Sequence, residues 1–499
     1  MSNFRYLWVP LALNLARNYG LKPLFIVSTI QDQQYYQSES NAYCVDVEFA
    51  IIPSLYEIAI SACDNEIVYL IQKANNYEKR FNVSLLRDVM QGDRHLGRGM
   101  VWGWNGKPNS KVANKSTEAG KIAACLESFK FYEDLMVSRP PKIVLGLGLG
   151  GGLFSKPIPL LCREKNIPFR SLSSSRIGGH FYWSVDEFNN SPELESMIKR
   201  HESAMSLAGE IDKQLAEPSS IYTYFSQKGG NRRSFLRAIK GAIHQILMRF
   251  YHQLRGYQKS RVGYYALSAG INVINQWWEM NRTERKPFVD LNDVSENSQI
   301  VLFPLQYEFE ASLYGESPEA NSLLFAIYET AISLPLGVIL AVKEHPLQPG
   351  RRPSEFYKKI SQLPNVVLLR PSVNTQQVLE KSTAVVQINS SLGYEAVIQG
   401  LQVFSFSRHG PIHGSSNNTP IRKSEDLQLL RAFLLDHDSD GKSKQRLANG
   451  IAYANAVDEY CFLIPEIKKI SEGGIQNDDL REMLEALRLT DIEKPMEMT

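Results

Sequence analysis

The sequence has 499 residues, which is more than one ordinary hydrophobic core holds, so we expect two domains with room for an insertion. A net charge of +2 with 22% charged residues argues against a general affinity for nucleic acid. The five cysteines form no C-x-x-C pair, which argues against a disulfide framework and indicates a reducing, cytoplasmic compartment. No apolar run approaches the ~20 residues that a membrane-spanning helix needs.

In chain order, the first 190 residues alternate helix-like and strand-like segments, which predicts a parallel α/β sheet. The predicted helices cover residues 11–18, 111–137 and 155–165, and the predicted strands cover 23–28, 99–104, 142–147 and 168–172.

The middle of the chain, from about residue 189 to 289, is predicted to be mostly helical. Residues 228–261 carry nine Lys or Arg and no Asp or Glu. Apolar side chains recur there at three- and four-residue steps, at Phe235, Ile239, Ile243, Ile246 and Phe250. This pattern suits a helix on an anionic membrane surface. It equally suits an interdomain helix with solvated charges, or a groove for an acidic glycan.

The α/β alternation then resumes. Strands are predicted at 300–303, 337–342, 366–369, 384–388 and 402–406, and helices at 319–334, 354–362, 375–381, 392–399, 424–438 and 442–463. The predicted fold is therefore α/β, with two Rossmann-like domains facing a cleft and a helical insertion. We assign the parts to residues 1–190, 191–295 (basic helical insertion), 296–470 and 471–499 (tail).

Two short motifs follow predicted buried strands: Lys343-Glu344-His345-Pro346, and a segment that begins Asn389-Ser390-Ser391. Ligands of open α/β sheets bind beyond the carboxyl ends of the strands, so both motifs should face one crevice. Ser390 or Ser391 is a good N-cap, and a helix start with free N–H groups suits a phosphate. His345 could donate to that phosphate or assist its departure, and Glu395 could accept hydrogen bonds from ribose hydroxyls. The alternative is a plain strand exit and a plain cap.

A His-Pro pair followed some tens of residues later by Ser-Ser resembles the motifs of bacterial sialyltransferases and of capsule 3-deoxy-manno-octulosonate (Kdo) transferases. Residues 300–410 are similar to capsular-polysaccharide glycosyltransferases of the GT-B architecture. The resemblance implies a nucleotide-sugar donor, with a CMP-sugar favoured, and a glycan or glycolipid acceptor. The donor-binding candidates are Gln306, Lys343, Pro346, Ser390, Ser391, Glu395 and Arg408.

The candidates for proton transfer are weaker. Asp186 begins an acidic pair that resembles the general base of the sialyltransferases, but Phe188 stands where that pattern has Gly. Glu308 is a second candidate acid or base. Only His409 and His413 have H-x-x-x-H spacing, and Gly410 and Pro411 between them argue against a shared helix face. We therefore expect a metal-independent enzyme without a cofactor.

On the acceptor side, Gly146, Gly148 and Gly151 satisfy G-x-G-x-x-G, yet no carboxylate ends the next strand to bind a ribose. A loop that lines the cleft, with Gly150 and Gly151, and a tight strand-to-helix turn remain equally good interpretations. The further acceptor-side candidates are Asn105 and Lys107, from a Trp-Gly-Trp and Asn-Gly-Lys resemblance to Kdo-transferase-like proteins, and Arg176 and His180 in an aromatic-rich loop.

The sequence thus favours a cytoplasmic glycosyltransferase of surface or capsular polysaccharide, peripheral on the inner face of the plasma membrane if its basic helix binds lipid. A nucleotide-sugar epimerase of the same fold is an alternative. A non-catalytic protein of glycan assembly is another.

Overall fold

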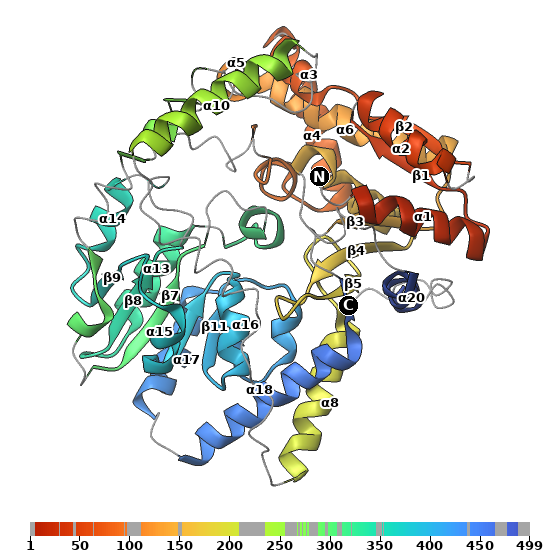
Figure 1. Ribbon diagram of the computed structural model, residues 1–499. Helices are drawn as coiled ribbons and strands as arrows, with labels where there is room; N and C mark the ends of the chain where they lie inside the picture. The colour runs from red at the N-terminus through yellow and green to blue at the C-terminus, as the bar shows by residue number, and fades with distance from the viewer. Residues whose placement is uncertain are drawn as a thin grey trace.

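The computed structural model describes residues 5–487 except for 29, 43–45, 63, 94, 97–110, 148–151, 209–234, 255–266, 268–269, 272, 276, 279–287, 295–297, 307–311, 321, 346–351, 353, 437–439 and 465–476. Figure 1 shows two α/β parts, one at the top right and one at the lower left.

The second part is built on a seven-stranded sheet in the order β12-β11-β10-β7-β8-β9-β6, in which every neighbouring pair is parallel. Its strands are β6 (Phe288–Val289), β7 (Ile300–Pro304), β8 (Ile339–Lys343), β9 (Val366–Leu369), β10 (Ala384–Gln387), β11 (Gln402–Ser405) and β12 (Asn418–Pro420). The central strands are nearly continuous apolar runs because helices cover both faces of the sheet.

One face of this sheet packs on α13 (Leu323–Ser333), α14 (Ser354–Ile360) and α17 (Leu427–Leu435). The other face packs on α8 (Pro192–Ala208), α15 (Thr375–Lys381), α16 (Ser391–Ile398), α18 (Asp440–Tyr460) and the short helix η7 (Pro411–Gly414). This doubly wound arrangement confirms the predicted α/β class, and β9 and α15 have the predicted bounds. The sheet begins earlier than predicted, since β6 lies before residue 296 and pairs with β9.

The first part holds two smaller sheets. The strands β1 (Leu24–Val27) and β2 (Glu48–Ile51) form a parallel pair, and β3 (Val144–Leu147), β4 (Phe169–Ser174), β5 (His180–Ser184) and β13 (Phe462–Leu463) form a sheet in the order β13-β5-β4-β3. Around them lie α1 (Arg5–Tyr19), α2 (Ile30–Ala42), α3 (Leu55–Ser61), η1 (Asp64–Glu66), α4 (Ile67–Phe81), η2 (Leu85–Met90), α5 (Lys111–Lys115), α6 (Glu118–Ser138), η4 (Gly152–Phe154) and α7 (Pro157–Glu164). The helix predicted over 111–137 is two helices, because Thr117 caps a new one through a hydrogen bond from the Gly120 N–H.

The prediction of a parallel sheet is wrong for part of the first half, because β5 is antiparallel to β4. Its aromatic residues were interpreted as a loop, yet aromatic side chains favour a pleated strand. Gly178 and Gly179, both with positive φ, form the turn that reverses the chain before His180. A Gly-Gly pair before an aromatic run is a hairpin signal that could have revealed this strand.

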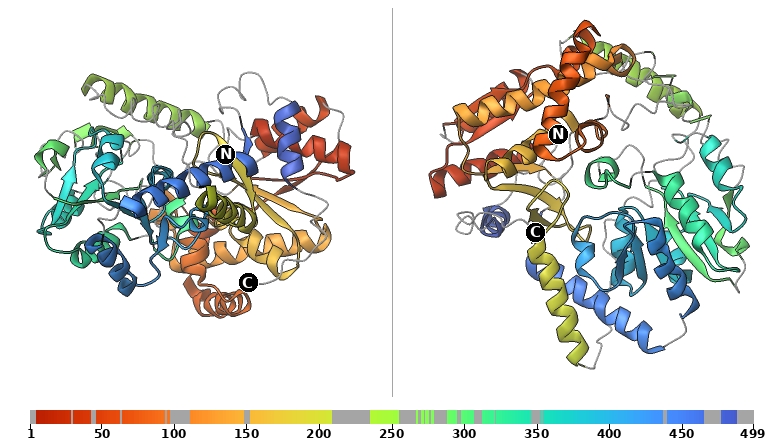
Figure 2. Two further views of the ribbon diagram at one scale, coloured as in Figure 1. Left: turned by 90° about the horizontal axis from the view of Figure 1, so that it is seen from below. Right: turned by 180° about the vertical axis from the view of Figure 1, so that it is seen from behind.

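The last described residues return to the first half of the chain. The helix predicted over 442–463 ends at Tyr460, and β13 pairs antiparallel with β5. Residues 471–499 were predicted as a tail, but they contain α20 (Asn477–Ala486), whose Leu480, Met483 and Leu484 are buried against α1. The apolar spacing of three and four residues explains why this segment folds as a packed helix. Both views of Figure 2 show this return.

The predicted basic helix is described in part, as α10 (Phe235–Leu254). It lies at the edge of the molecule in all three ribbon views (Figures 1 and 2). Among the described helices, none is both long enough and apolar enough to cross a bilayer.

Candidate functional site

The candidate site lies at the ends of two neighbouring strands of the seven-stranded sheet, β7 and β10. After these strands the chain continues on opposite faces of the sheet. The connection after β7 leads to α13 on one face, and the connection after β10 leads to α16 on the other. Such a divergence leaves a crevice at the carboxyl ends of the two strands, where open α/β sheets bind their ligands. Gln306 follows β7, and Asn389 and Ser390 follow β10, so both segments border this crevice.

Gln306 joins the two segments. Its buried side chain donates from Nε2 to the Asn389 carbonyl, and its Oε1 accepts from the Asn389 N–H at 3.3 Å. Gln306 was predicted to contact the donor, whereas its amide here fixes the backbone that precedes the helix start.

The helix start itself has the predicted form. Ser390 is the N-cap of α16, and its Oγ accepts from the Leu392 N–H at 3.2 Å, which confirms the predicted cap. Ser391 is the first helical residue and is half-buried. Beneath them, the buried Gln387 accepts from the Ser390 N–H at 2.9 Å. A Cβ on Gly393 would lie 2.1 Å from the Gln387 side chain, so a larger residue here would displace that amide.

Replacing both Ser390 and Ser391 with Ala should weaken nucleotide binding and lower the free energy of unfolding by about 1 kcal/mol, the usual loss of one cap. Calorimetric nucleotide titration and urea unfolding measure the two effects. Asn374→Ala is the matched control, since Asn374 caps α15 through the Gln376 and Gln377 N–H groups. It should lose similar stability and keep normal affinity. If the native protein and both variants bound the nucleotide with equal affinity, the two serines would have only a capping role.

His345 follows β8 directly and is half-buried. Its backbone N–H donates to the Glu344 Oε1 at 2.7 Å. Burial lowers the pKa of His345, and the neighbouring carboxylate of Glu344 opposes this shift. The imidazole is therefore neutral at pH 7, so one ring nitrogen is a donor and the other an acceptor.

Glu344 is held in a fully buried ion pair. Arg352 donates from Nε to the Glu344 Oε2 at 3.0 Å and from Nη2 to the Gln306 carbonyl at 3.0 Å. The Tyr357 hydroxyl donates to the same carboxylate oxygen. This network ties the end of β8 to the end of β7 and thereby fixes the backbone position of His345.

Lys343 is the last residue of β8, and its buried ammonium donates to the Pro371 carbonyl at 3.4 Å. Its side chain thus extends toward the end of β9. Burial lowers the pKa of Lys343 to about 8. A phosphate beside Lys343 would raise this pKa again.

Lys343→Met should stabilise the ligand-free protein at pH 7, because folding then no longer places a cation in a desolvated site. The folded pKa lies below the usual value of about 10.4, so the unfolded chain binds more protons between the two. The native protein should therefore gain stability as the pH rises from about 8 to about 10.4, and this gain should be absent in Lys343→Met. Urea unfolding of both proteins at several pH values tests this. Parallel pH profiles would contradict it.

Asp186 lies in a different cluster. Its Oδ1 accepts from the Phe188 N–H at 2.9 Å and from the Asn190 N–H at 3.1 Å, and its Oδ2 accepts from the Asn190 Nδ2 at 2.7 Å. Asn190 in turn contacts the His409 Nδ1 at 3.1 Å and accepts from the Gly410 N–H at 3.0 Å. Asp186 therefore holds Asn190 in place, and Asn190 contacts the segment that follows β11. Three strand spacings of about 4.8 Å each separate that end from β8 and His345.

Glu395 lies one turn into α16, half-buried, as the motif predicts. Arg408, after β11, is exposed, and its Nη2 donates to the Arg422 carbonyl at 3.4 Å. The structure thus brings Gln306, His345 and the two serines to adjacent strand ends, with Arg408 further along the same edge.

Arg176 and His180 belong to the β4–β5 hairpin. Arg176 has a positive φ of 67° in its turn. The His180 Nε2 lies 3.3 Å from the Asp458 Oδ1 of α18. His180 was predicted in an aromatic-rich loop on the acceptor side, but it starts a strand and faces this helix.

The remaining predicted site residues lie outside the described residues: Glu308, Pro346, Asn105, Lys107, Gly150 and Gly151. Within the part of the chain that is described, no group of three or more His, Cys, Asp or Glu is placed to hold a metal ion.

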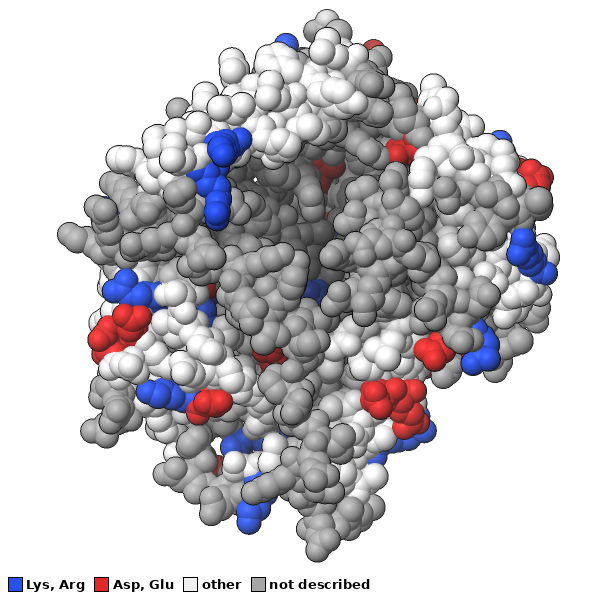
Figure 3. Space-filling model, viewed as in Figure 1, with Lys and Arg blue, Asp and Glu red and all other residues white. Residues whose placement is uncertain are grey.

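The carboxyl edge of the large sheet faces the first half of the chain. Besides the Asn190 contacts, the buried Lys156 donates to the Gly315 carbonyl at 2.6 Å, in the short helix η6 (Ser312–Glu316) after β7. The Phe188 ring stacks on His409 with centroids 4.3 Å apart. Figure 3 shows a hollow in the surface between the two halves.

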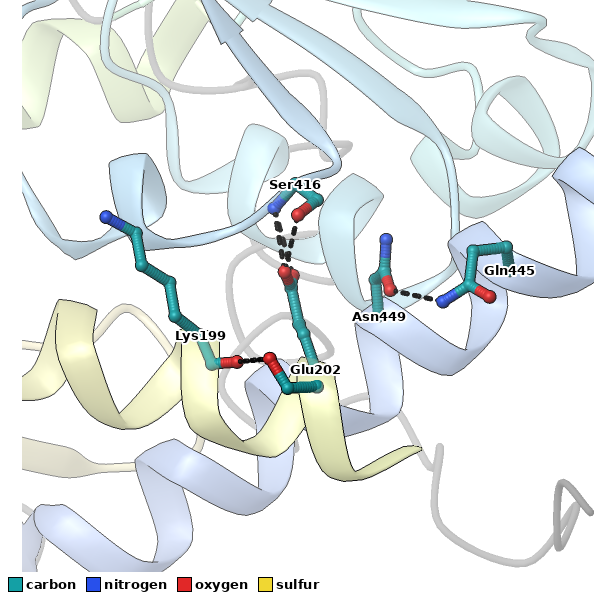
Figure 4. Close-up of a pocket in the computed structure, with 6 residues that line it drawn as sticks. Lys199, Glu202, Ser416, Gln445 and Asn449 are labelled. Carbon is teal, nitrogen blue, oxygen red and sulfur yellow. Dashed lines mark hydrogen bonds between the residues drawn. The ribbon is translucent and has the colours of Figure 1, made fainter. Parts of the chain in front are cut away.

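A polar pocket of about 350 Å³ lies elsewhere, between α8, α18 and the segment after η7 (Figure 4). In it, the Glu202 carboxylate accepts from the Ser415 Oγ at 2.9 Å and from the Ser416 Oγ at 2.6 Å. These bonds fix α8 to the second half, so we interpret the pocket as a structural contact.

Sequence reasoning missed Arg352, Tyr357 and Lys156. The apolar strand β8 ends in Lys343-Glu344-His345. Three consecutive polar residues at the end of a buried strand indicate that one of them, here the Glu344 carboxylate, is buried. Nothing in the spacing identifies its partner.

Comparison with known proteins gave one family match. Residues 211–409 match the model of a family described as "Capsule polysaccharide biosynthesis protein", which is less than half of the chain. No curated protein matched the sequence.

Similar solved structures include KpsC of Thermosulfurimonas dismutans as β-Kdo 2,7 transferase, with 14% identity, a TM-score of 0.28 and coverage of 60% of this chain and 78% of that chain. The same protein as β-Kdo 2,4 transferase has 14% identity, a TM-score of 0.30 and coverage of 63% and 80%. A UDP-GlcNAc 2-epimerase from Neisseria meningitidis has 9% identity, a TM-score of 0.26 and coverage of 90% and 93%.

Proposed function

We propose that this protein is a metal-independent glycosyltransferase that transfers a sugar from a nucleotide-activated donor to a growing surface polysaccharide or its lipid-linked acceptor. The observation that carries the proposal is the crevice between β7 and β10, bordered by a helix start with two serines, with a neutral histidine at the end of β8 on the same edge of the sheet. The match of residues 211–409 to a capsule-biosynthesis family supports it, because that range contains these strand ends.

In this proposal the second half binds the donor. The N–H groups at the start of α16 and the hydroxyls of Ser390 and Ser391 bind the phosphate, and His345 donates to the oxygen that carries charge as the sugar leaves. The His-Pro and Ser-Ser resemblance favours a CMP-sugar.

The acceptor hydroxyl needs a base from the other side of the crevice. Asp186 is the first candidate by resemblance, although both its oxygens already bind its own loop. Glu308 is the second candidate. Asp186→Asn and Glu308→Gln, measured separately, decide between them, since loss of the base should lower turnover by about 10²-fold or more.

Incubation with CMP-, CDP- and UDP-sugars, with and without a capsular oligosaccharide acceptor, tests the function itself. Nucleotide release that requires acceptor and persists in a chelator supports the proposal. Conversion of the sugar without release would indicate an epimerase. Neither reaction, with binding of glycan alone, would indicate a non-catalytic protein. Cytoplasmic location follows from the nucleotide-sugar substrate and stays part of the proposal.

A further inference from the structure

The helix α10 has two apolar faces of different kinds. Its inner face is packed: Ala238 and Ala242 are buried, and a Cβ on Gly270 would lie 2.5 Å from the Ile246 side chain. The Phe235 ring lies 4.9 Å from that of Trp277. The inner face therefore already has its partner within the chain.

The outer face carries a second apolar stripe. Leu236, Ile243, Leu247, Phe250 and Leu254 follow one another at steps of seven, four, three and four residues, which places them on one side of a helix. Leu236 is 72% exposed, Leu247 is 62% exposed and Leu254 is 89% exposed. Of the predicted stripe, Ile239 and Ile246 are half-buried, whereas Ile243 and Phe250 are exposed and belong to this outer stripe.

All charges of α10 have one sign. The helix contains Arg237, Lys240 and Arg249 and no Asp or Glu. Arg237 and Lys240 are exposed and lie on the same side of the stripe near its N-terminal end, at one and four residues after Leu236. Figure 3 shows basic side chains near α10, at the rim of the hollow. An apolar stripe on a helix whose only charged residues are cations matches the apolar interior and anionic headgroups of a bilayer surface.

A comparison within the molecule supports the choice of a lipid surface. The helix α13 also exposes an apolar stripe, with Phe325, Tyr328 and Ile332 between 51% and 59% exposed. That helix carries Glu329 and no basic residue. It therefore lacks the charge complementarity that distinguishes α10.

We propose that the outer face of α10 docks the protein on an anionic lipid surface, with Leu236, Ile243, Leu247, Phe250 and Leu254 inserted at the headgroup boundary. Arg237 and Lys240 lie at headgroup level, where each strengthens binding about fivefold at low salt. The helix lies along the membrane plane at the edge of the molecule, and it does not cross the bilayer. The inference does not depend on the proposed activity.

Flotation of the full chain with vesicles tests this proposal. We expect binding to phosphatidylcholine vesicles with about 30% phosphatidylglycerol at about 0.01 M salt, and release at about 1 M salt, where the Debye length is about 3 Å. The double variant Arg237→Gln/Lys240→Gln should bind about 20-fold more weakly. Ile243→Ser/Leu247→Ser should bind at least about tenfold more weakly.

The matched control is Tyr328→Ser/Ile332→Ser, which removes equally exposed apolar side chains from α13 and should bind as the native protein does. Circular dichroism melting confirms that each variant is folded. Absence of flotation at low salt would overturn the proposal, as would equal loss in the control variant. Light scattering that showed a dimer dissolved by Ile243→Ser/Leu247→Ser, without flotation, would assign the stripe to contact between copies of the chain.

Discussion

Replacement of His345 with Ala should lower turnover by about 10²-fold or more, the scale of one lost donor to a developing anion. The fold should survive, because His345 lies after β8 and is half-buried, outside the hydrophobic core of the sheet. Steady-state kinetics with the donor identified by the nucleotide panel, together with a melting curve, measure both effects. His201→Ala is the control. His201 lies on α8 and its side chain contacts Glu459 of α18, not a residue at the strand ends.

The pH profile separates a chemical role of His345 from a structural one. Because burial lowers the pKa of His345, its imidazole takes up a second proton only at a more acidic pH than an ordinary histidine does, and the added charge beside the phosphate should change kcat/KM in that acid range. His345→Gln keeps an N–H donor but does not titrate in this range, so this pH-dependent change should be absent. Near-native turnover in His345→Ala would contradict the proposed site.

Arg352→Met should destabilise the protein by about 3–5 kcal/mol, because the Glu344 carboxylate would remain buried without its cation. Both side chains of this pair are 0% exposed, so solvent cannot replace the lost partner. Urea unfolding at neutral pH measures the loss. The double variant Glu344→Gln/Arg352→Met should recover a large part of it, since no isolated charge is then buried.

Arg370→Met gives the comparison with an exposed ion pair. Arg370 bonds to Asp290 at 3.0 Å, the same separation as in the buried pair, but its side chain is 39% exposed. Its loss should lower stability by at most about 1 kcal/mol. Equal losses in Arg352→Met and Arg370→Met would show that burial does not control the strength of the Glu344 pair.

The second half was predictable because its signals are local. Buried parallel strands such as Val366–Leu369 read as continuous apolar runs, and caps such as Asn374 and Ser390 mark where the next helix begins. The location of the candidate residues at the carboxyl edge of the sheet follows from the rule that open α/β sheets bind their ligands beyond the carboxyl ends of their strands.

The first half was less predictable because its partners are distant in sequence. The strand β5 pairs with Phe462 and Leu463, nearly 300 residues later, and no local pattern reports that pairing. The Gln306 and Arg352 side chains, similarly, are fixed by bonds to the ends of other strands. The sequence identifies polar residues at strand ends, but only the fold shows which of them form hydrogen bonds to the backbone.

The return of β13 and α20 to the first half affects the order in which the parts of the chain fold during synthesis. One core cluster of the first half contains Leu7 and Leu11 together with Met483 and Leu484, from opposite ends of the sequence. During synthesis that core stays incomplete until the ribosome has released the segment after residue 476. The second half, whose sheet is contiguous from residue 288 to 420, can fold before it. This part of the first half should therefore complete its fold after the second half, although its first residues are translated earlier.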